Sequence, residues 1–317
     1  MISKDLNLAA TILREEGIIG LPTETVYGLA GNVFSEKAIK EIYDIKQRPL
    51  YNPLIVHIKN TEELKKIAID IPPIAFELAT KFWPGPLTLL LKKNFLVPDI
   101  VTSSKPTVAV RMPNHPIALA LLNQLDFPLA APSANPFGMI SPTKAAHVNE
   151  YFTDKLVLDG GNCETGIEST IVGFIDNEVI IYRLGGISIE DIKSVSGEVK
   201  ILNKNDEAPE APGMLSKHYA PQTPLFFTND IENFSKKYKD NRIGLILFSK
   251  SIEIFSDNWI QCILSPKADL KKAASKLYET LHLLDKMNLD CIIAEQFPDE
   301  GLGCVINDKL SRASKND

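Results

Sequence analysis

Short runs of β-branched and leucine residues alternate with helical patterns through the N-terminal two thirds of the chain. Such runs predict buried strands, whereas apolar residues spaced three and four apart predict helices. Their alternation indicates an α/β fold. The expected strands are residues 18–21, 53–58, 87–91, 107–110, 156–158, 169–174 and 179–182.

One helix is predicted between the first two of these strands, with Ser35 as its N-cap. It has to end before Pro49, because the residue that precedes a proline avoids helical backbone angles. Lys46 and Arg48 therefore lie where the chain leaves the helix. Further helices are expected at residues 64–68 and 74–82.

The pattern changes near Leu202, where proline, glycine and charged residues replace the periodic segments. Beyond this stretch, an apolar run at 243–248, an amphipathic helix at 270–284 and a second run at 292–294 predict a smaller doubly wound domain. No Gly-x-Gly-x-x-Gly fingerprint accompanies them. The expected divisions are a domain at 1–202, a linker at 203–222 and a domain at 223–317.

Composition limits the classes of function that fit. The 317 residues are 44% hydrophobic and 23% charged, as in ordinary globular proteins, and no apolar run approaches the ~20 residues of a membrane helix. The N-terminus lacks the basic and apolar regions of a secretory signal, so we expect a cytoplasmic protein without membrane contact. The net charge of −6 is evenly spread, with 19 basic and 23 acidic residues in 1–202, which argues against a broad polyanion-binding face.

The four cysteines form no Cys-x-x-Cys pair. In a cytoplasmic protein, isolated cysteines are more often buried thiols than disulfides or zinc ligands. We therefore expect no protein-bound metal site.

Two short segments suggest an anion site. Lys46 and Arg48 supply positive charge, since arginine forks onto phosphate oxygens and lysine acts as a mobile point charge. Ser133 and Asn135 add a hydroxyl and a carboxamide between two prolines. Together the segments favour a nucleotide, although a rigid proline-bracketed loop is the alternative for the second.

Other polar residues also have simple structural interpretations. Thr23, Thr25 and Tyr27 surround Glu24 and fit a turn that satisfies its own backbone. A lone histidine such as His57 within an apolar run is often a hydrogen-bonded core residue. Arg111, at the end of a strand, fits either a surface ion pair or a carboxylate clamp. Arg183 before two glycines and Ser169 before a strand fit simple turns.

Read together, these segments resemble the threonylcarbamoyl-AMP synthase family in its long two-domain form, over essentially the whole chain. The long form is indicated by APGM at 211–214, KHYAP at 217–221, GLG at 301–303 and IND at 306–308. The other matching strings are PTETVYGL at 22–29, KQRP at 46–49, NPLIVH at 52–57, WPGPLT at 83–88, VRMP at 110–113, APSAN at 131–135, GIESTI at 166–171 and RLG at 183–185.

The resemblance implies a YrdC-like N-terminal domain with a twisted open sheet and a smaller Rossmann-like C-terminal domain. It also implies a reaction in which L-threonine, bicarbonate or CO2, and ATP give L-threonylcarbamoyl-AMP and pyrophosphate. The product serves N6-threonylcarbamoyladenosine formation in tRNA, so the downstream transfer machinery is an expected partner and a weak tRNA contact is an open question. Mg²⁺ is expected on the ATP phosphates, without a dedicated protein cage.

The family's functional residues map onto this chain by motif. Lys46 and Arg48 are the expected catalytic cations, and His218 with Tyr219 would belong to a lid that shields the carbamate from water. The expected ATP-binding residues are Lys46, Arg48, Asn52, Thr107, Ser133, Asn135, Ser141, Arg183 and Tyr219. The expected threonine-binding residues are Thr25, His57, Arg111, the Ala131 backbone and Ser169.

Two rival functions fit parts of the sequence. A structured-RNA-binding module would use Lys46, Arg48 and Arg111 as a basic surface and would need no catalytic motif. The excess of acidic over basic residues and the small number of basic clusters argue against an RNA-binding module. A carbamoyl-transfer maturation enzyme that shares this domain type would need paired zinc cysteines and additional domains, and the four scattered cysteines in 317 residues argue against it.

Overall fold

A computed structural model describes residues 1–176, 178–204, 209–253 and 256–314. The chain divides into two compact units. Unit 1 comprises Met1–Phe137 and Ser141–Ser216, and unit 2 comprises Gly138–Ile140 and Lys217–Asp317. The predicted linker at 203–222 is thus shared between the units, and its residues 205–208 lie outside the described part.

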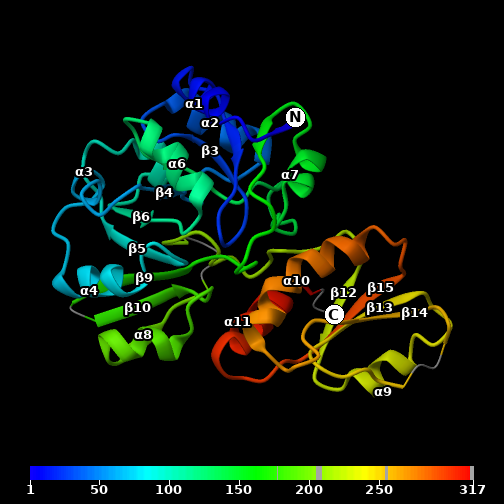
Figure 1. The fold of residues 1–317 in the computed structure, drawn as a ribbon. Coiled ribbons are helices and arrows are strands. Elements are labelled where there is room, and N and C mark those ends of the chain that lie inside the picture. The colour runs from blue at the N-terminus through cyan, green and yellow to red at the C-terminus, as the bar shows by residue number, and fades with distance from the viewer. Residues whose placement is uncertain (177, 205–208, 254–255, 315–317) are drawn as a thin grey trace. The chain divides into compact units, whose positions relative to one another are not determined.

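Unit 1 is built on a mixed sheet, drawn in blue to green in Figure 1. Within the described residues the sheet has 11 strands in the order β1-β8-β2-β3-β7-β4-β6-β5-β9-β10-β11. The α/β fold class is confirmed, and each predicted strand of this region overlaps an observed one. The strands are β1 (Ile2–Ser3), β2 (Ile19–Leu21), β3 (Gly28–Asn32), β4 (Ile55–His57), β5 (Leu87–Lys92), β6 (Thr107–Arg111), β7 (Leu129–Ala130), β8 (Leu156–Leu158), β9 (Thr170–Ile175), β10 (Glu178–Arg183) and β11 (Val199–Ile201).

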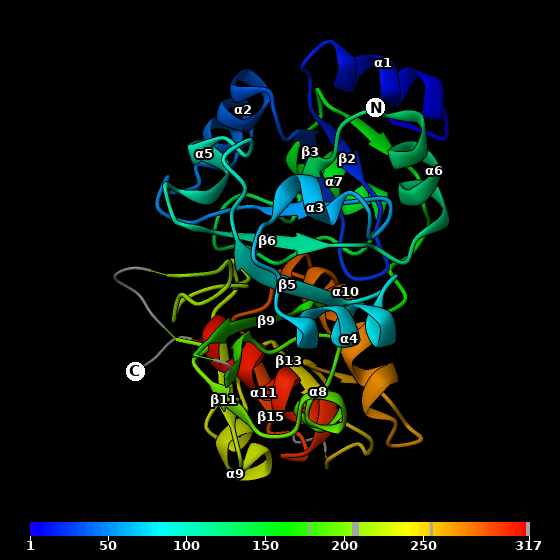
Figure 2. The same ribbon diagram turned by 90° about the vertical axis from the view of Figure 1, so that its left-hand side faces the viewer.

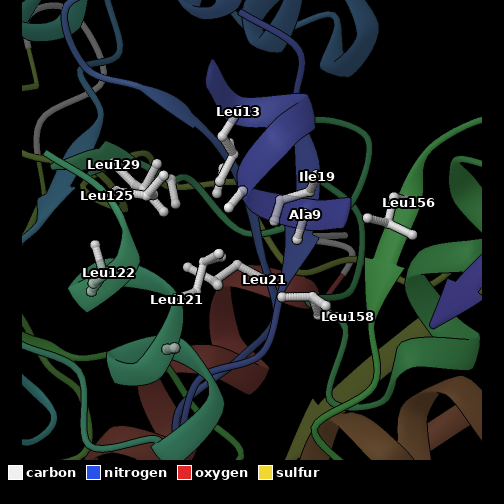
Figure 3. Packing of buried hydrophobic residues seen from close by; sticks show 14 residues of the cluster. Ala9, Leu13, Ile19, Leu21, Leu121, Leu122, Leu125, Leu129, Leu156 and Leu158 are labelled. Carbon is white, nitrogen blue, oxygen red and sulfur yellow. The ribbon is translucent and has the colours of Figure 1, made fainter. Parts of the chain in front are cut away.

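Helices pack against this sheet and bury its apolar faces. Ser35 caps α2 as predicted, accepting a hydrogen bond of 3.2 Å from the Ala38 N–H. One apolar cluster, shown in Figure 3, joins α1 and α6 to β2 and β8. The helices are α1 (Leu6–Arg14), α2 (Glu36–Lys46), α3 (Leu64–Ile67), α4 (Pro73–Phe82), α5 (Asp99–Thr102), α6 (Pro116–Gln124), α7 (Ala145–Tyr151) and α8 (Ile189–Ser196).

Part of the predicted linker belongs to the core of unit 1. Ala211 and Met214 are fully buried in a cluster that includes Ile55 and Ile171 of the sheet. The Pro212 carbonyl also accepts a hydrogen bond of 3.3 Å from Arg183 Nη1. The proline and glycine content of this segment reflects an irregular backbone, whereas its alanine and methionine contribute to the core.

Unit 2 carries a parallel sheet, drawn in yellow to red in Figure 1. In its described residues the sheet has 4 strands in the order β12-β15-β13-β14. The predicted segments at 243–248, 270–284 and 292–294 are confirmed as strand, helix and strand. The elements are β12 (Leu225–Thr228), α9 (Ile231–Lys236), β13 (Ile243–Leu247), β14 (Trp259–Ile263), α10 (Leu270–Asp285), β15 (Cys291–Glu295) and α11 (Gly301–Ala313). None of the helices in the described residues is long and apolar enough to span a membrane.

Candidate functional site

Four strands of unit 1 bring polar side chains to one edge of the sheet. The parallel strands β4 and β6 both end there, with His57 opposite Arg111. The antiparallel strand β5 begins at the same edge, with Thr88 opposite Arg111, and β5 and β6 lie side by side in Figure 2. β9 starts beside β5, immediately after Ser169. These residues, distant in sequence, therefore share one region.

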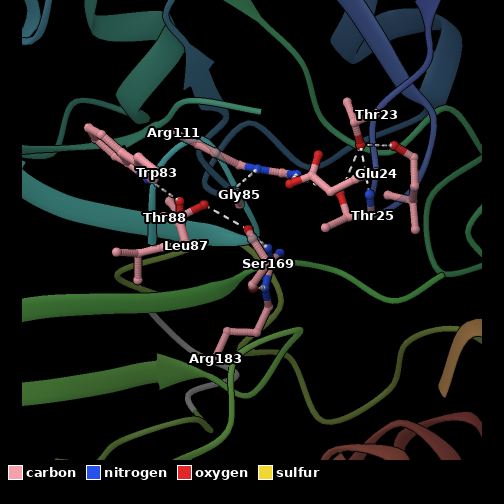
Figure 4. A network of polar contacts seen from close by, with 11 residues as sticks. Thr23, Glu24, Thr25, Trp83, Gly85, Leu87, Thr88, Arg111, Ser169 and Arg183 are labelled. Carbon is pink, nitrogen blue, oxygen red and sulfur yellow. Dashed lines mark hydrogen bonds and ion pairs between the residues drawn. The ribbon is translucent and has the colours of Figure 1, made fainter. Parts of the chain in front are cut away.

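Arg111 is the centre of a buried polar network (Figure 4). Its Nη2 lies 2.6 Å from Glu24 Oε1, and its Nη1 donates a hydrogen bond of 2.8 Å to Thr25 Oγ1. Its Nε donates to the Gly85 carbonyl at 3.3 Å. The reading of Arg111 as a surface ion pair is wrong, because both it and Glu24 are buried. A buried guanidinium held at a strand end is suited to carboxylate recognition.

The hydroxyl groups of the β2–β3 loop are oriented by their neighbours. Thr23 donates its hydroxyl proton to the Val26 carbonyl at 2.6 Å. The contact of 2.9 Å between Thr23 Oγ1 and Thr25 Oγ1 is therefore donated by Thr25. The loop does satisfy its own backbone, as the structural interpretation predicts, and it also presents Thr25 to Arg111.

A second part of the network surrounds Ser169. Its hydroxyl lies 2.7 Å from Thr88 Oγ1 and accepts a hydrogen bond of 2.9 Å from Arg183 Nη2. Arg183 Nε also donates to the Ser169 carbonyl at 3.0 Å. Ser169 and Thr88 are fully buried. Arg183 thus holds both the side chain and the backbone carbonyl of Ser169, just before β9.

His57 is a buried, neutral imidazole. Burial lowers its pKa to about 3, and the positive charge of Arg111 contributes to this shift. Its Nδ1 lies 3.2 Å from the Ile55 carbonyl, which can only accept, so Nδ1 carries the proton. Nε2 is consequently a hydrogen-bond acceptor.

Lys46 is the last residue of α2, and its side chain is buried. Gln47 adopts the left-handed conformation with φ 52°, which terminates the helix before Pro49 as predicted. Lys46 Nζ donates to the carbonyls of Ser133 (2.6 Å) and Asn135. Burial lowers the pKa of Lys46 well below its usual value, and the charge of Arg48 lowers it further. The two carbonyl contacts favour the ammonium form.

Arg48 is also buried and organises the loop before β4. Its Nη2 donates to Asn52 Oδ1 and to the Pro53 carbonyl, both at 2.7 Å. Asn52 Nδ2 is buried and finds no acceptor among the described residues. An unsatisfied buried donor beside two cations is the arrangement that an anion completes.

The β2–β3 loop connects the Arg111 network to the Lys46 contacts. The Tyr27 carbonyl accepts a hydrogen bond of 2.8 Å from the N–H of Ala134, between the two residues whose carbonyls hold Lys46. Ala131 donates its N–H to the Ile55 carbonyl at 2.9 Å, so its own carbonyl is the backbone group able to contact a ligand. Ser141, in the same stretch, donates to Glu168 Oε1 at 2.6 Å, one residue before Ser169.

One of the predicted site residues lies apart from this region, and two others belong to the other unit. Thr107 is at the opposite end of β6 from Arg111, and its buried hydroxyl has no partner within the described chain. His218 and Tyr219 belong to unit 2. There Tyr219 is buried, with its ring 5.6 Å from that of Tyr278 and 4.8 Å from Lys309 Nζ.

Sequence reasoning assigned no role to Glu24, Thr88 or Glu168, which the structure adds to the networks. Each lies inside one of the motif strings. A carboxylate enclosed by apolar and hydroxyl residues has to find a partner when it is buried. That requirement is the signal from which Glu24 and Glu168 can be predicted.

No group of three histidine, cysteine or acidic side chains converges as a metal site among the described residues. Glu24 faces Arg111, and Glu168 accepts from Ser141. Around Lys46 the side chains offer cations and amides rather than carboxylates.

Comparison with known families covers both units. A family model described as telomere recombination, of the Sua5, YciO and YrdC group, matches residues 11–185. A second, described as the C-terminal domain of threonylcarbamoyl-AMP synthase, matches residues 187–315.

Relatives match over nearly their full length. The threonylcarbamoyl-AMP synthase of Bacillus subtilis (strain 168) is 39% identical, covering 96% of this chain and 92% of the relative. That of Pyrococcus abyssi is 38% identical, covering 98% and 94%. The crystal structure of P. abyssi Sua5 complexed with L-threonine superposes with a TM-score of 0.90 at 38% identity, over 98% of this chain and 94% of that one. This chain belongs to the threonylcarbamoyl-AMP synthase family.

Proposed function

We propose that this chain joins L-threonine, bicarbonate or CO2, and ATP into L-threonylcarbamoyl-AMP, with release of pyrophosphate. Membership of the synthase family supports this reaction. The P. abyssi relative has been crystallised with L-threonine, which supports threonine as a substrate here. The polar networks of unit 1 support the individual binding roles.

Threonine would bind at the Arg111 network. The guanidinium is the partner of the threonine carboxylate, and Glu24 holds it in position. Glu24 Oε2, which contacts no donor among the described residues, is also a suitable partner for the ammonium group. Neutral His57 offers an acceptor to the substrate hydroxyl, which would favour threonine over analogues without that group. Thr25, Ser169 and the Ala131 carbonyl would complete the site.

ATP would bind beside the threonine site. Lys46, Arg48 and Asn52 are the phosphate-binding residues of this proposal, because they supply two basic side chains and a buried unsatisfied amide. The remainder of the nucleotide site would be formed by Ser133, Asn135, Ser141, Arg183 and Tyr219, whereas Thr107 is left out because it lies at the opposite end of β6 from Arg111. Mg²⁺ would arrive with the substrate as the ATP complex and neutralise phosphate charge.

The reaction needs positioning and charge rather than a protein nucleophile. The threonine ammonium group loses a proton to solvent, and the resulting amine bonds to CO2 with release of a second proton to solvent. An oxygen of the resulting carbamate then attacks the α-phosphorus of ATP. The bond to pyrophosphate breaks as negative charge grows on the phosphate oxygens. Lys46 and Arg48 would stabilise that charge, and the fixed networks would hold the reactants in line.

We expect His218 and Tyr219 to act in a lid that excludes water from the carbamate. A chain that ends at Ser216 retains unit 1 and lacks both residues. Slow turnover by this fragment, with intact threonine binding, supports the lid, and full turnover rejects it. The unstable product would pass to the tRNA threonylcarbamoyl-transfer machinery in the cytoplasm, with at most a weak contact to tRNA itself.

One observation carries the proposal. The loop that presents Glu24 and Thr25 to Arg111 also bonds, through the Tyr27 carbonyl, to the segment whose carbonyls hold Lys46. An amino-acid site and an anion site are therefore built on one loop. This proximity is what a transfer from a carbamate to a nucleotide requires.

The direct test uses ¹³C-bicarbonate with threonine and ATP. Mass spectrometry of the quenched reaction should detect threonylcarbamoyl-AMP that carries one additional mass unit. Its absence under conditions where the B. subtilis relative forms the product would reject the proposed reaction. RNA binding that depends on salt and proceeds without ATP consumption would instead favour the RNA-binding alternative.

A further inference from the structure

Unit 2 has a crevice of about 620 Å³ at one edge of its parallel sheet. The lining comes from the segments that follow β12, β13 and β15, which is where the carboxyl ends of these strands meet. The volume falls within the range of small-molecule sites. None of the residues placed in the threonine and ATP sites of unit 1 lines this crevice.

The strand order makes this the switch point of the sheet. From β12 the chain crosses by α9 to β13, two positions along the sheet, and from β14 it returns by α10 to β15, two positions in the opposite direction. Right-handed crossovers in opposite directions place their helices on opposite faces. α9 follows β12, whereas β15 is followed by α11, which packs against α10, so the adjacent strands β12 and β15 lead to opposite faces. Ligands of open α/β sheets bind in the crevice at such a point.

Two residues of α11 fix the wall that follows β15. Asn307 accepts a hydrogen bond from the Phe297 N–H at 2.9 Å and donates to the Phe297 carbonyl at 3.0 Å. A Cβ on Gly303 would lie 1.9 Å from the Pro298 carbonyl oxygen, so only glycine permits this approach. These two residues lie in the C-terminal GLG and IND strings, which the chemistry of unit 1 does not use. They hold the crevice in a defined shape.

The lining combines an aromatic surface with a carboxylate and a cation. The half-buried Phe248 ring lies 5.3 Å from the buried Phe297 ring. Glu295, at the end of β15, accepts a hydrogen bond from the Phe248 N–H. Exposed Lys250 lies between Ser249 and Ser251 on the same wall.

We propose that this crevice binds a ribonucleoside 5′-monophosphate. The base would stack on Phe248, since an aromatic ring accepts any base by its face. Glu295 would accept hydrogen bonds from the ribose hydroxyls, the role that a carboxylate at a strand end has in doubly wound folds. Lys250 with the flanking serine hydroxyls would bind the phosphate. The site is separate from the proposed catalytic function and does not depend on it.

The test uses AMP and the full-length protein with ¹³C-labelled isoleucine methyl groups. Ile231 and Ile252 line the crevice and report its occupancy, whereas Ile55 of β4 reports the catalytic region. Titration with AMP should shift the signals of Ile231 and Ile252. Glu295→Gln keeps an acceptor for the Phe248 N–H and should weaken this binding about tenfold, as expected for loss of a charged hydrogen-bond partner. The control Glu62→Gln, at an exposed residue, should leave it unchanged.

Two further titrations test the contacts proposed for the ribose and the phosphate. The ligand 2′-deoxy-AMP should bind more weakly than AMP at the crevice, and Lys250→Ala should weaken AMP binding but not adenosine binding. The proposal is overturned if millimolar AMP shifts only Ile55, if Glu295→Gln binds as the unaltered protein does, or if both nucleotides bind equally.

Discussion

Arg111 and Glu24 form an ion pair of 2.6 Å in which both side chains are buried. The two residues lie in different motif strings and meet because the β2–β3 loop reaches the end of β6. A buried pair of this kind adds little net stability, yet removal of one partner leaves an uncompensated charge. Its value here is that it fixes a guanidinium in the orientation that we propose for threonine recognition.

Loss of Arg111 should affect both stability and threonine binding. Arg111→Ala is expected to destabilise unit 1 by about 3–5 kcal/mol, because Glu24 stays buried without its partner. Addition of Glu24→Gln should recover part of that loss, so the two changes should not be additive in urea denaturation. Calorimetry at a temperature where the variant is folded should find threonine affinity reduced at least tenfold. Unchanged affinity would reject the carboxylate role.

ATP binding should raise the pKa of Lys46, and it should therefore be coupled to proton uptake by this side chain at pH values above its pKa in the free protein. Burial lowers its pKa well below the usual value, and the polyphosphate of ATP would favour the ammonium form. Calorimetric titration of ATP in buffers with different ionisation enthalpies measures the protons taken up. Lys46→Met should abolish the uptake, whereas the exposed neighbour Lys40→Met should not. Equal uptake in all three proteins would assign the proton to another group.

His57 should make the fold sensitive to acid. Its pKa falls from 6.5 in the unfolded chain to about 3 in the folded one, so the unfolded state binds more protons between these values. The stabilisation is fully present above pH 6.5 and is lost as the pH falls toward 3, by about 1.4 kcal/mol per pH unit. Between pH 7 and pH 4.5 the unaltered protein should therefore lose about 2–3 kcal/mol more than His57→Gln in urea denaturation. Parallel losses in the two proteins would show that His57 does not titrate as described.

Met214 should stabilise unit 1 although it lies in a segment without regular structure. It is fully buried against the sheet. Met214→Ala is expected to cost about 2–5 kcal/mol, whereas Leu202→Ala at an exposed position should change stability by less than about 0.5 kcal/mol. A chain that ends at Leu202 should be correspondingly less stable than one that ends at Ser216. Equal stability of these fragments would show that the segment does not contribute to the core.

The sequence predicts the strands that are rich in β-branched residues and the helix that ends at Lys46, because local propensity and burial agree there. It does not predict β3, whose residues Gly28–Asn32 include no β-branched side chain. This strand is stabilised by pairing with β2 and β7, which are distant or short segments. The order of the strands likewise depends on contacts between distant segments, which the local sequence pattern does not predict.

For the site, motif strings predicted which residue types matter but not how they pair. The motifs assign Arg111 to an external carboxylate, while its partner in the structure is Glu24. Lys46 was expected to face phosphate, and it is held by the Ser133 and Asn135 carbonyls. Such partners come from loops that meet only in the folded chain, so spacing in the sequence cannot identify them.

Pyrophosphate release, with each substrate omitted in turn, tests the central claim most directly. The two networks on one loop predict that release requires threonine, bicarbonate and ATP together. Arg48→Ala, whose Nη2 contact with Asn52 orders the phosphate side, should reduce the rate about a hundredfold or more. Release that continues at the same rate without threonine or bicarbonate would contradict the proposed transfer.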